Sequence, residues 1–240
     1  MHIPDGYLGP VTYGGLWAAM VSVWFYASRK IRTSLRIAEI PMIALSAAFS
    51  FVIMMFNIPV PGGTTGHATG AILIAILIGP WPAVIAVSIA LVIQALMFGD
   101  GGITAIGANC FNMAFGGMVS GYGLYRLIAG KRREAQGSEE IQNSKFKIQN
   151  SFGARNITGA AIGAYAGINI AALLTALELG IQPLMHTGID GRPLYSPFPL
   201  TVTVPVIMIG HAVFFGVLEA IVTVLVLVYL KKSHPELIRG

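Results

Sequence analysis

The 240-residue chain is too apolar for a water-soluble domain, because 55% of it is hydrophobic and only 10% is charged, whereas soluble domains carry about 25% charged residues. Its mean hydropathy of +0.74 predicts an integral membrane protein in contact with the lipid bilayer. The isoelectric point of 9.5 does not indicate nucleic-acid binding, because the basic residues cluster at the ends of apolar segments, where they report membrane topology.

Apolar segments follow one another along the chain, at about residues 11–28, 38–57, 68–79, 82–98, 105–129, 156–179 and 200–230. They predict an all-α fold, a polytopic membrane bundle of seven transmembrane helices that forms a single integral domain over residues 1–240. The tight turn signal Gly79-Pro80-Trp81-Pro82 predicts that the third and fourth segments form a helical hairpin. Residues 131–155 are polar and have no apolar period, so we expect a flexible loop there.

The basic residues also predict the orientation of the bundle. Fourteen of the 15 Lys and Arg residues fall on one side of the membrane if the chain crosses it seven times, and only Arg192 lies opposite. Since positive charge concentrates on the cytoplasmic side, we expect the N-terminus outside, with the C-terminus and the loop at 131–155 in the cytoplasm. Six or eight crossings would break this agreement.

The first two residues form a candidate metal chelate, and residues 1–10 are the expected metal-binding N-terminus. We expect Met1 to be the mature N-terminus, with no signal peptide ahead of it, because the bulk of His2 should prevent removal of the start methionine. The Met1 amine, the His2 amide nitrogen and a His2 ring nitrogen can close two chelate rings around one ion and leave a fourth in-plane position open. Four nitrogens in a plane favour Ni(II) or Cu(II). The alternative is a chance histidine at an untidy terminus.

The loop from Asn57 to His67 would lie on the same outer side as Met1 and offers the fourth ligand, His67. The third segment, of about 12 residues, is only about 18 Å long as a helix and too short for a hydrocarbon core of about 30 Å. We therefore expect the loop to dip inward and to place His67 in a recess capped by the N-terminus, because irregular backbone at membrane depth must be buried or hydrated. The alternative is a helix-start histidine that hydrogen-bonds a neighbouring carbonyl.

Further polar residues are candidates for supporting these ligands. Asp5 could orient His2 or offset the charge of the ion, and could equally be a turn residue. Asn109 and Asn112 lie one helical turn apart near the outer end of the fifth segment, where they could support the pocket or pair between helices. Asp100 is expected to be an ordinary loop residue.

His211 and Glu219 lie within the last apolar segment, and ionisable groups at membrane depth are candidates for function. They are eight residues apart, which is about 12 Å along a helix, so they do not pair directly. We expect a structural or subunit-contact role for both rather than metal binding.

Small residues recur at every fourth position on three segments, a spacing that lets helices approach closely: Ala44 and Ala48, Gly117 and Gly121, and Gly159, Gly163 and Gly167. We expect most of these stripes to pack the bundle.

Three motifs stand out at the positions just discussed: Met1-His2-Ile3-x-Asp5-Gly6, Gly63-Thr64-Thr65-Gly66-His67-x-x-Gly70 and Gly107-Ala108-Asn109-x-x-Asn112-Met113. Together they resemble the CbiM/NikM family, the substrate-binding (S) membrane subunits of energy-coupling-factor (ECF) importers for cobalt and nickel. The resemblance covers nearly the whole chain apart from residues 131–155. It implies a multi-pass protein of the prokaryotic cell membrane, a transporter subunit rather than an enzyme. The implied partners are a transmembrane coupling (T) subunit, cytoplasmic ATPase (A) subunits and, as an option, a small accessory membrane subunit.

The resemblance also implies the ligands. The metal would be held by the Met1 amine, the amide and imidazole of His2 and the imidazole of His67. The transported substrate would be Ni(II), with Co(II) left open, since the residues at positions 4 and 5 look more like the nickel branch than the cobalt branch. An alanine pair on the first core helix would contact the coupling subunit, for which Ala44 and Ala48 are the candidates.

Other classes of membrane protein have their own sequence motifs. The chain contains no Gly-x-x-x-x-Gly-Lys-Ser/Thr loop, so ATP hydrolysis must come from partners. An intramembrane metalloprotease would need His-Glu-x-x-His, and a seven-helix light receptor would need a lysine within residues 200–230; the sequence has neither. A stand-alone metal-ion channel or secondary carrier stays open as an alternative, because transport without partners requires no motif.

Overall fold

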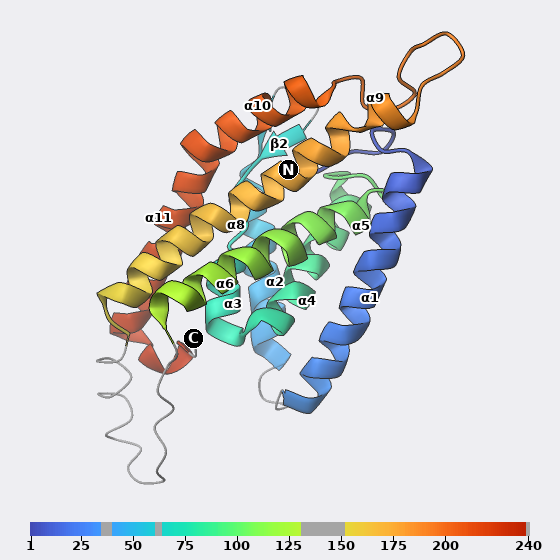
Figure 1. The fold of residues 1–240 in the computed structure, drawn as a ribbon. Helices are drawn as coiled ribbons and strands as arrows, with labels where there is room; N and C mark the ends of the chain where they lie inside the picture. The colour runs from blue at the N-terminus through green and yellow to red at the C-terminus, as the bar shows by residue number, and fades with distance from the viewer. Residues whose placement is uncertain (35–39, 61–63, 131–151, 239–240) are drawn as a thin grey trace.

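The structure is a computed structural model that describes residues 1–34, 40–60, 64–130 and 152–238 of the chain. The helices pack side by side into one bundle (Figure 1). Residues 131–151 of the expected loop lie outside the described residues, as do Arg36 and Arg239, two of the basic residues counted for the topology. The last residues of that predicted loop, from Ala154 on, already belong to the following helix.

Within the described residues the expected all-helical architecture is confirmed, with seven helical segments. In chain order these are α1 (Pro10–Ser34), α2 (Ile40–Met54), α3 (Ala71–Ile78), α4 (Pro80–Ile93) with its π-helical end η2 (Gln94–Phe98), the rod α5–η3–α6 (Ile106–Asn109, Cys110–Gly117, Met118–Ala129), α8 (Ala154–Gly180) with the short α9 (Gln182–Met185), and the rod α10–η4–α11 (Leu200–Gly210, His211–Phe215, Gly216–Ser233). A short 3₁₀ helix, η5 (Pro235–Leu237), follows the last rod. The only strands described are β1 (Ile58–Val60) and β2 (Thr64–Gly66), which pair antiparallel.

Three of the described helices are long and apolar enough to cross a membrane, namely Pro80–Phe98, Ala154–Met185 and Leu200–Ser233. The helix of the third segment is shorter than the sequence predicts. It begins only at Ala71, because Gly70 adopts a left-handed conformation with φ of 67°, and its eight residues span about 12 Å. The chain between β2 and α3 is therefore irregular and buried inside the bundle.

The glycine stripes pack the centre of the bundle, as expected. A Cβ atom at Gly117 would lie 2.5 Å from the carbonyl oxygen of Gly167, and a Cβ at Gly121 would meet the carbonyl oxygen of Gly163 even more closely. Both glycines lie on the α5–η3–α6 rod and face α8, so the two backbones touch in a way that no side chain would permit. Figure 1 shows this rod and α8 running side by side.

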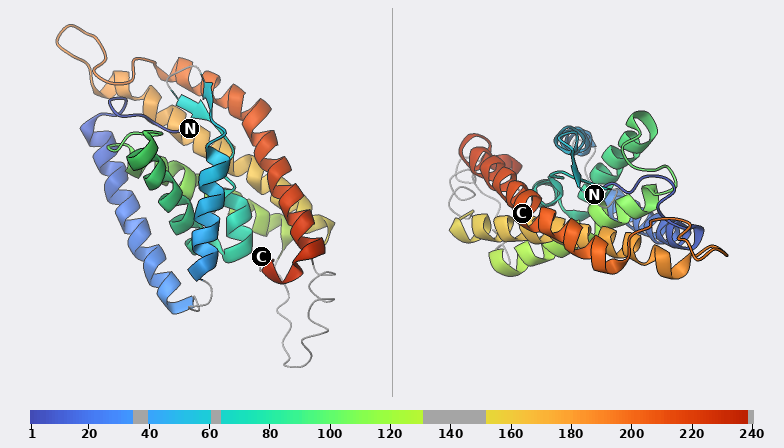
Figure 2. Two further views of the ribbon diagram at one scale, coloured as in Figure 1. Left: turned by 180° about the vertical axis from the view of Figure 1, so that it is seen from behind. Right: turned by 90° about the horizontal axis from the view of Figure 1, so that it is seen from above.

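The N-terminus lies at one end of the bundle, next to β2, and in the view from above it sits near the middle of the helices (Figures 1 and 2). The last turns of α1, α6 and α11 lie at the opposite end. These turns carry Arg32, Arg126, Lys231 and Lys232. The bundle thus has a basic end and, opposite it, an end that holds the N-terminus.

Candidate metal centre

The first three residues are drawn into the protein rather than left in solvent. Met1 and Ile3 are fully buried, and His2 is 3% exposed. The Met1 amine donates to the carbonyl oxygen of Thr65 in β2, and the hydroxyl of Thr64 donates to the carbonyl oxygen of His2 at 3.0 Å. Strand β2 therefore fixes the terminal amine directly beside the segment that leads into His67.

Asn109 on α5 clamps the main chain just after His2. Its side-chain oxygen accepts the Ile3 N–H at 2.8 Å, and its amide group donates to the Ile3 carbonyl at 3.2 Å. The Gly102 N–H also donates to that carbonyl, at 2.8 Å. Since these bonds satisfy both backbone polar groups of the buried residue Ile3, they hold the terminus in place.

The imidazoles of His2 and His67 lie against each other, with ring centroids 4.6 Å apart and planes inclined by 39°. His67 is fully buried, and its Nδ1 lies 3.0 Å from the carbonyl oxygen of Ala68. Because a carbonyl can only accept, Nδ1 carries the proton and the Nε2 lone pair is free. The Nε2 atoms of both rings are buried without a hydrogen-bond partner in the described part of the chain. A carbonyl on the far nitrogen is the usual arrangement around a metal-ligating histidine.

Asp100 contacts His2, which corrects the expectation that it is an ordinary loop residue. Its Oδ1 lies 2.7 Å from His2 Nδ1, so the carboxylate is a direct neighbour of the imidazole. The Asn57 amide donates to both carboxylate oxygens at 3.0 Å. The turn around Asp100 favours glycine at position 101, because its φ is 95° and a Cβ there would lie only 3.0 Å from the Nδ2 atom of Asn109.

Burial changes the pKa values of the Met1 amine and of the two imidazoles in the direction that favours metal binding. Desolvation lowers the pKa of the Met1 amine to about 4 and lowers the pKa of His2 and, further still, that of His67. The amine and both imidazoles are therefore neutral at pH 7, the form in which nitrogen binds metal. Burial raises the pKa of Asp100, but its contacts with His2, the amine and Asn57 outweigh this and lower it. Asp100 thus places a negative charge beside a cluster of neutral nitrogen donors.

Among the described residues no three His, Cys, Asp or Glu side chains group together as metal ligands. The Met1 amine and the His2 amide place main-chain nitrogens next to the two imidazoles. Together with the two imidazoles they offer four nitrogens, a donor set that suits a square-planar ion.

The hydrogen-bond partners of Asp5, Asn109 and Asn112 distinguish the roles of these three supporting candidates. Asp5 is exposed and accepts the N–H groups of Ile103 and Thr104 at 3.0 and 2.8 Å, so it anchors a turn rather than orienting His2. Asn112 donates to Thr175 at 3.2 Å and to Glu178 at 2.8 Å on α8, so it pairs two helices. Of the three supporting candidates, the structure brings only Asn109 into contact with the backbone next to His2.

Ala44 and Ala48 are exposed on α2, whereas Ser46, Ala47 and Ser50 on the same helix are buried. Helix α2, blue in Figure 2, lies at the outer edge of the bundle. The alanine pair therefore points outward, and small side chains at such positions allow another helix to approach closely.

A comparison with protein families identifies the class of membrane protein to which this chain belongs. The model of the CbiM family, described as the cobalt uptake substrate-specific transmembrane region, matches residues 2–237. The chain belongs to the CbiM family. This family comprises membrane components of prokaryotic metal transporters rather than enzymes, and the chain is a multi-pass membrane protein.

Relatives of this CbiM-family chain include a fused nickel transport protein NikMN of Rhodobacter capsulatus, 48% identical over 99% of the chain, and a probable fused nickel transport protein LarMN of Lactiplantibacillus plantarum, 42% identical over 98%. The chain spans only 64% and 66% of the length of these two relatives. A crystal structure of a truncated transition metal transporter matches with a TM-score of 0.85 at 46% identity, covering 98% of this chain and all of that one. These matches confirm the expected family, whose named relatives are nickel and metal transport proteins.

Proposed function

We propose that this chain is the substrate-capture subunit of an energy-coupling-factor importer and that it binds Ni(II) from outside the cell through the Met1 amine, the His2 amide and imidazole and the His67 imidazole. The observation that carries the proposal is the burial of these groups in one closed cluster. Taking an unpartnered imidazole nitrogen out of water is costly, and a metal ion would bind the Nδ1 atom of His2, within the chelate, together with the free Nε2 atom of His67.

The proposed topology has seven crossings, with the N-terminus outside and the C-terminus in the cytoplasm. The separation of the basic helix ends from the N-terminal end supports it, because basic residues concentrate on the cytoplasmic side. In this orientation the nitrogen cluster lies close to the outer surface, where it can capture a dilute external ion.

The proposed partners are a transmembrane coupling subunit, cytoplasmic ATPases and, as an option, a small accessory membrane subunit. The exposed alanines of α2 support a helical partner in the membrane. The single-domain arrangement of residues 1–240, with a cytoplasmic loop that ends before α8, belongs to the same proposal.

Metal analysis of the purified protein, combined with its absorption spectrum, tests the metal site. We expect one Ni(II) per chain with the yellow colour of a square-planar, diamagnetic complex, and Co(II) as the competing substrate. A protein that binds neither ion would overturn the proposal.

Uptake measured in vesicles tests the energy source. Transport that needs the coupling subunit and ATP supports the importer, whereas uptake by the chain alone would favour a channel or secondary carrier instead.

A further inference from the structure

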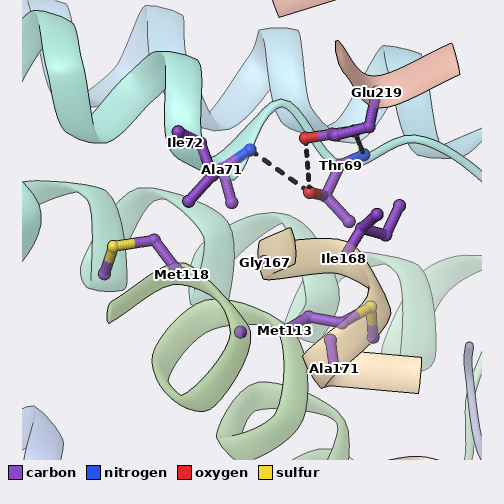
Figure 3. A pocket seen from close by; sticks show the side chains of 10 residues that line it. Thr69, Ala71, Ile72, Met113, Met118, Gly167, Ile168, Ala171 and Glu219 are labelled. Carbon is purple, nitrogen blue, oxygen red and sulfur yellow. Dashed lines mark hydrogen bonds between the residues drawn. The ribbon is translucent and has the colours of Figure 1, made fainter. Parts of the chain in front are cut away.

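Glu219 on α11 satisfies the turn that follows His67. The residue is only 1% exposed. Its Oε2 accepts the Thr69 N–H at 2.6 Å, and its Oε1 accepts the Gly70 N–H at 2.9 Å and the Thr69 hydroxyl at 3.1 Å. The Thr69 hydroxyl in turn accepts the Ala71 N–H at 3.2 Å. Figure 3 shows the carboxylate lying over Thr69, with this chain of hydrogen bonds running on to Ala71.

This turn needs a polar partner from outside its own sequence. The N–H groups of Thr69 and Gly70 lie in buried, irregular backbone just before α3, where an unpaired N–H is costly, and no side chain of the turn accepts them. The adjoining cavity has a volume of about 10 Å³ and is lined mainly by apolar side chains, which leaves room for at most one water molecule. The carboxylate, rather than solvent, therefore satisfies the turn.

The main chain is fixed on both sides of His67, and by the same helical rod. Just before it, Gly66 packs so closely on the ring of Phe215 in η4 that a Cβ atom would overlap the ring. Just after it, Glu219 holds Thr69. A second anchor comes from α2, where the Ser50 hydroxyl donates to the Thr69 carbonyl at 2.8 Å. The position of the His67 imidazole thus depends on contacts made one residue before it and two residues after it.

We propose that Glu219 is a positioning residue of the metal centre: by holding Thr69 and Gly70 it keeps the His67 imidazole beside His2 before the ion arrives. The inference rests on the proposed function, since it assigns Glu219 a part in that same site. Prior ordering raises affinity because the ion need not organise its own ligands. It also assigns a role to an acidic residue placed within an apolar segment.

Glu219→Gln is the direct test, read by calorimetric titration with Ni(II). A glutamine fills nearly the same space, but its NH₂ group cannot accept a hydrogen bond from a backbone N–H. The Kd for Ni(II) should rise by about 10- to 100-fold, as is usual when a supporting partner of a metal ligand is removed. The matched control is Glu178→Gln on α8, the same change at a buried carboxylate that bonds Asn112 instead, and it should leave the Kd unchanged. Unchanged affinity in Glu219→Gln, or an equal loss in both variants, would overturn the proposal.

A double-mutant cycle separates positioning from general stability. Cu(II) is the probe, because it has the highest affinity for nitrogen sites and should still bind the three N-terminal nitrogens in His67→Ala. If Glu219 acts through His67, Glu219→Gln should weaken Cu(II) binding in the wild-type background and have no further effect in His67→Ala. Equal losses in both backgrounds would refute positioning.

The outcomes for this inference and for the proposed function remain distinct. If the wild-type chain binds neither Ni(II) nor Cu(II), the proposed function is overturned and this inference with it. If the wild-type chain binds Ni(II) and Glu219→Gln binds it equally tightly, only the inference is overturned. Should Glu219→Gln fail to fold, Thr69→Val removes one of the three donors to the carboxylate and should weaken Ni(II) binding in the same direction. A folded Thr69→Val with wild-type affinity would then count against the proposal.

Discussion

Replacing Asn109 by alanine should weaken Ni(II) binding without removing any proposed ligand. Asn109 is 3% exposed, and its side chain makes two hydrogen bonds to Ile3, the residue after His2. In Asn109→Ala the Ile3 carbonyl keeps the Gly102 N–H as a donor, but the buried Ile3 N–H loses its acceptor. The change therefore acts on the docking of the N-terminus.

The magnitude follows from that single unpaired group. A buried N–H without a partner costs about 1–3 kcal/mol, and each 1.4 kcal/mol is about tenfold in an equilibrium constant. We expect the Kd for Ni(II) to rise by about 5- to 150-fold, because the less favourable free energy of docking the N-terminus is subtracted from the free energy of Ni(II) binding. Isothermal titration of the detergent-solubilised protein measures this change directly.

Asn112→Ala is the matched control, since Asn112 lies one helical turn away and is equally buried but bonds Thr175 and Glu178. It should lower the thermal stability of the bundle while leaving the Kd close to wild type. Wild-type affinity in Asn109→Ala, or the same loss of affinity in both variants, would refute the reasoning.

Two further predictions concern the ligands and the partner surface. His2→Ala and His67→Ala should each abolish high-affinity Ni(II) binding while leaving a folded, membrane-inserted protein, because each removes an imidazole donor; near wild-type affinity in either titration would remove that residue from the site. Ala44→Leu and Ala48→Leu should leave the Ni(II) affinity unchanged but weaken co-purification with the coupling subunit and uptake, because added bulk on an exposed small-residue face blocks close helix approach. Unchanged assembly and uptake would reduce the pair to ordinary surface residues.

The features that could be predicted from the sequence are those with a regular pattern or a fixed position in the chain. The spacing of Gly117, Gly121, Gly163 and Gly167 indicates close helix packing, and the structure has these backbones in contact. The short third segment predicts that the loop before it dips inward, and His67 is buried there next to His2. Both features follow from local rules on helix length and backbone polarity, which need no knowledge of distant residues.

The supporting residues of the site could not be predicted in the same way, because they come from distant parts of the chain. Asp100 reaches His2 only through the fold, and its neighbours Gly99, Gly101 and Gly102 gave only a turn signal. Glu219 lies 150 residues after Thr69, so its role depends on how the last rod packs against the His67 turn. Asn109 and Asn112 look alike in sequence, and only the packing of α5 and η3 shows that they face different partners.

A direct Ni(II) titration of two tagged proteins tests the central claim. One protein carries a single extra residue before Met1, and the other carries an extension after Gly240. The N-terminal addition turns the Met1 amine into an amide while every side chain is kept, and Met1 is fully buried with its amine bonded to Thr65, so the added residue also has no room there. With the terminal residue of each protein verified by mass spectrometry, we expect tight Ni(II) binding to vanish in the N-terminally extended protein and to persist in the C-terminally extended one. Equal, tight binding by both would contradict the amine-based chelate and leave His67 to act with other ligands.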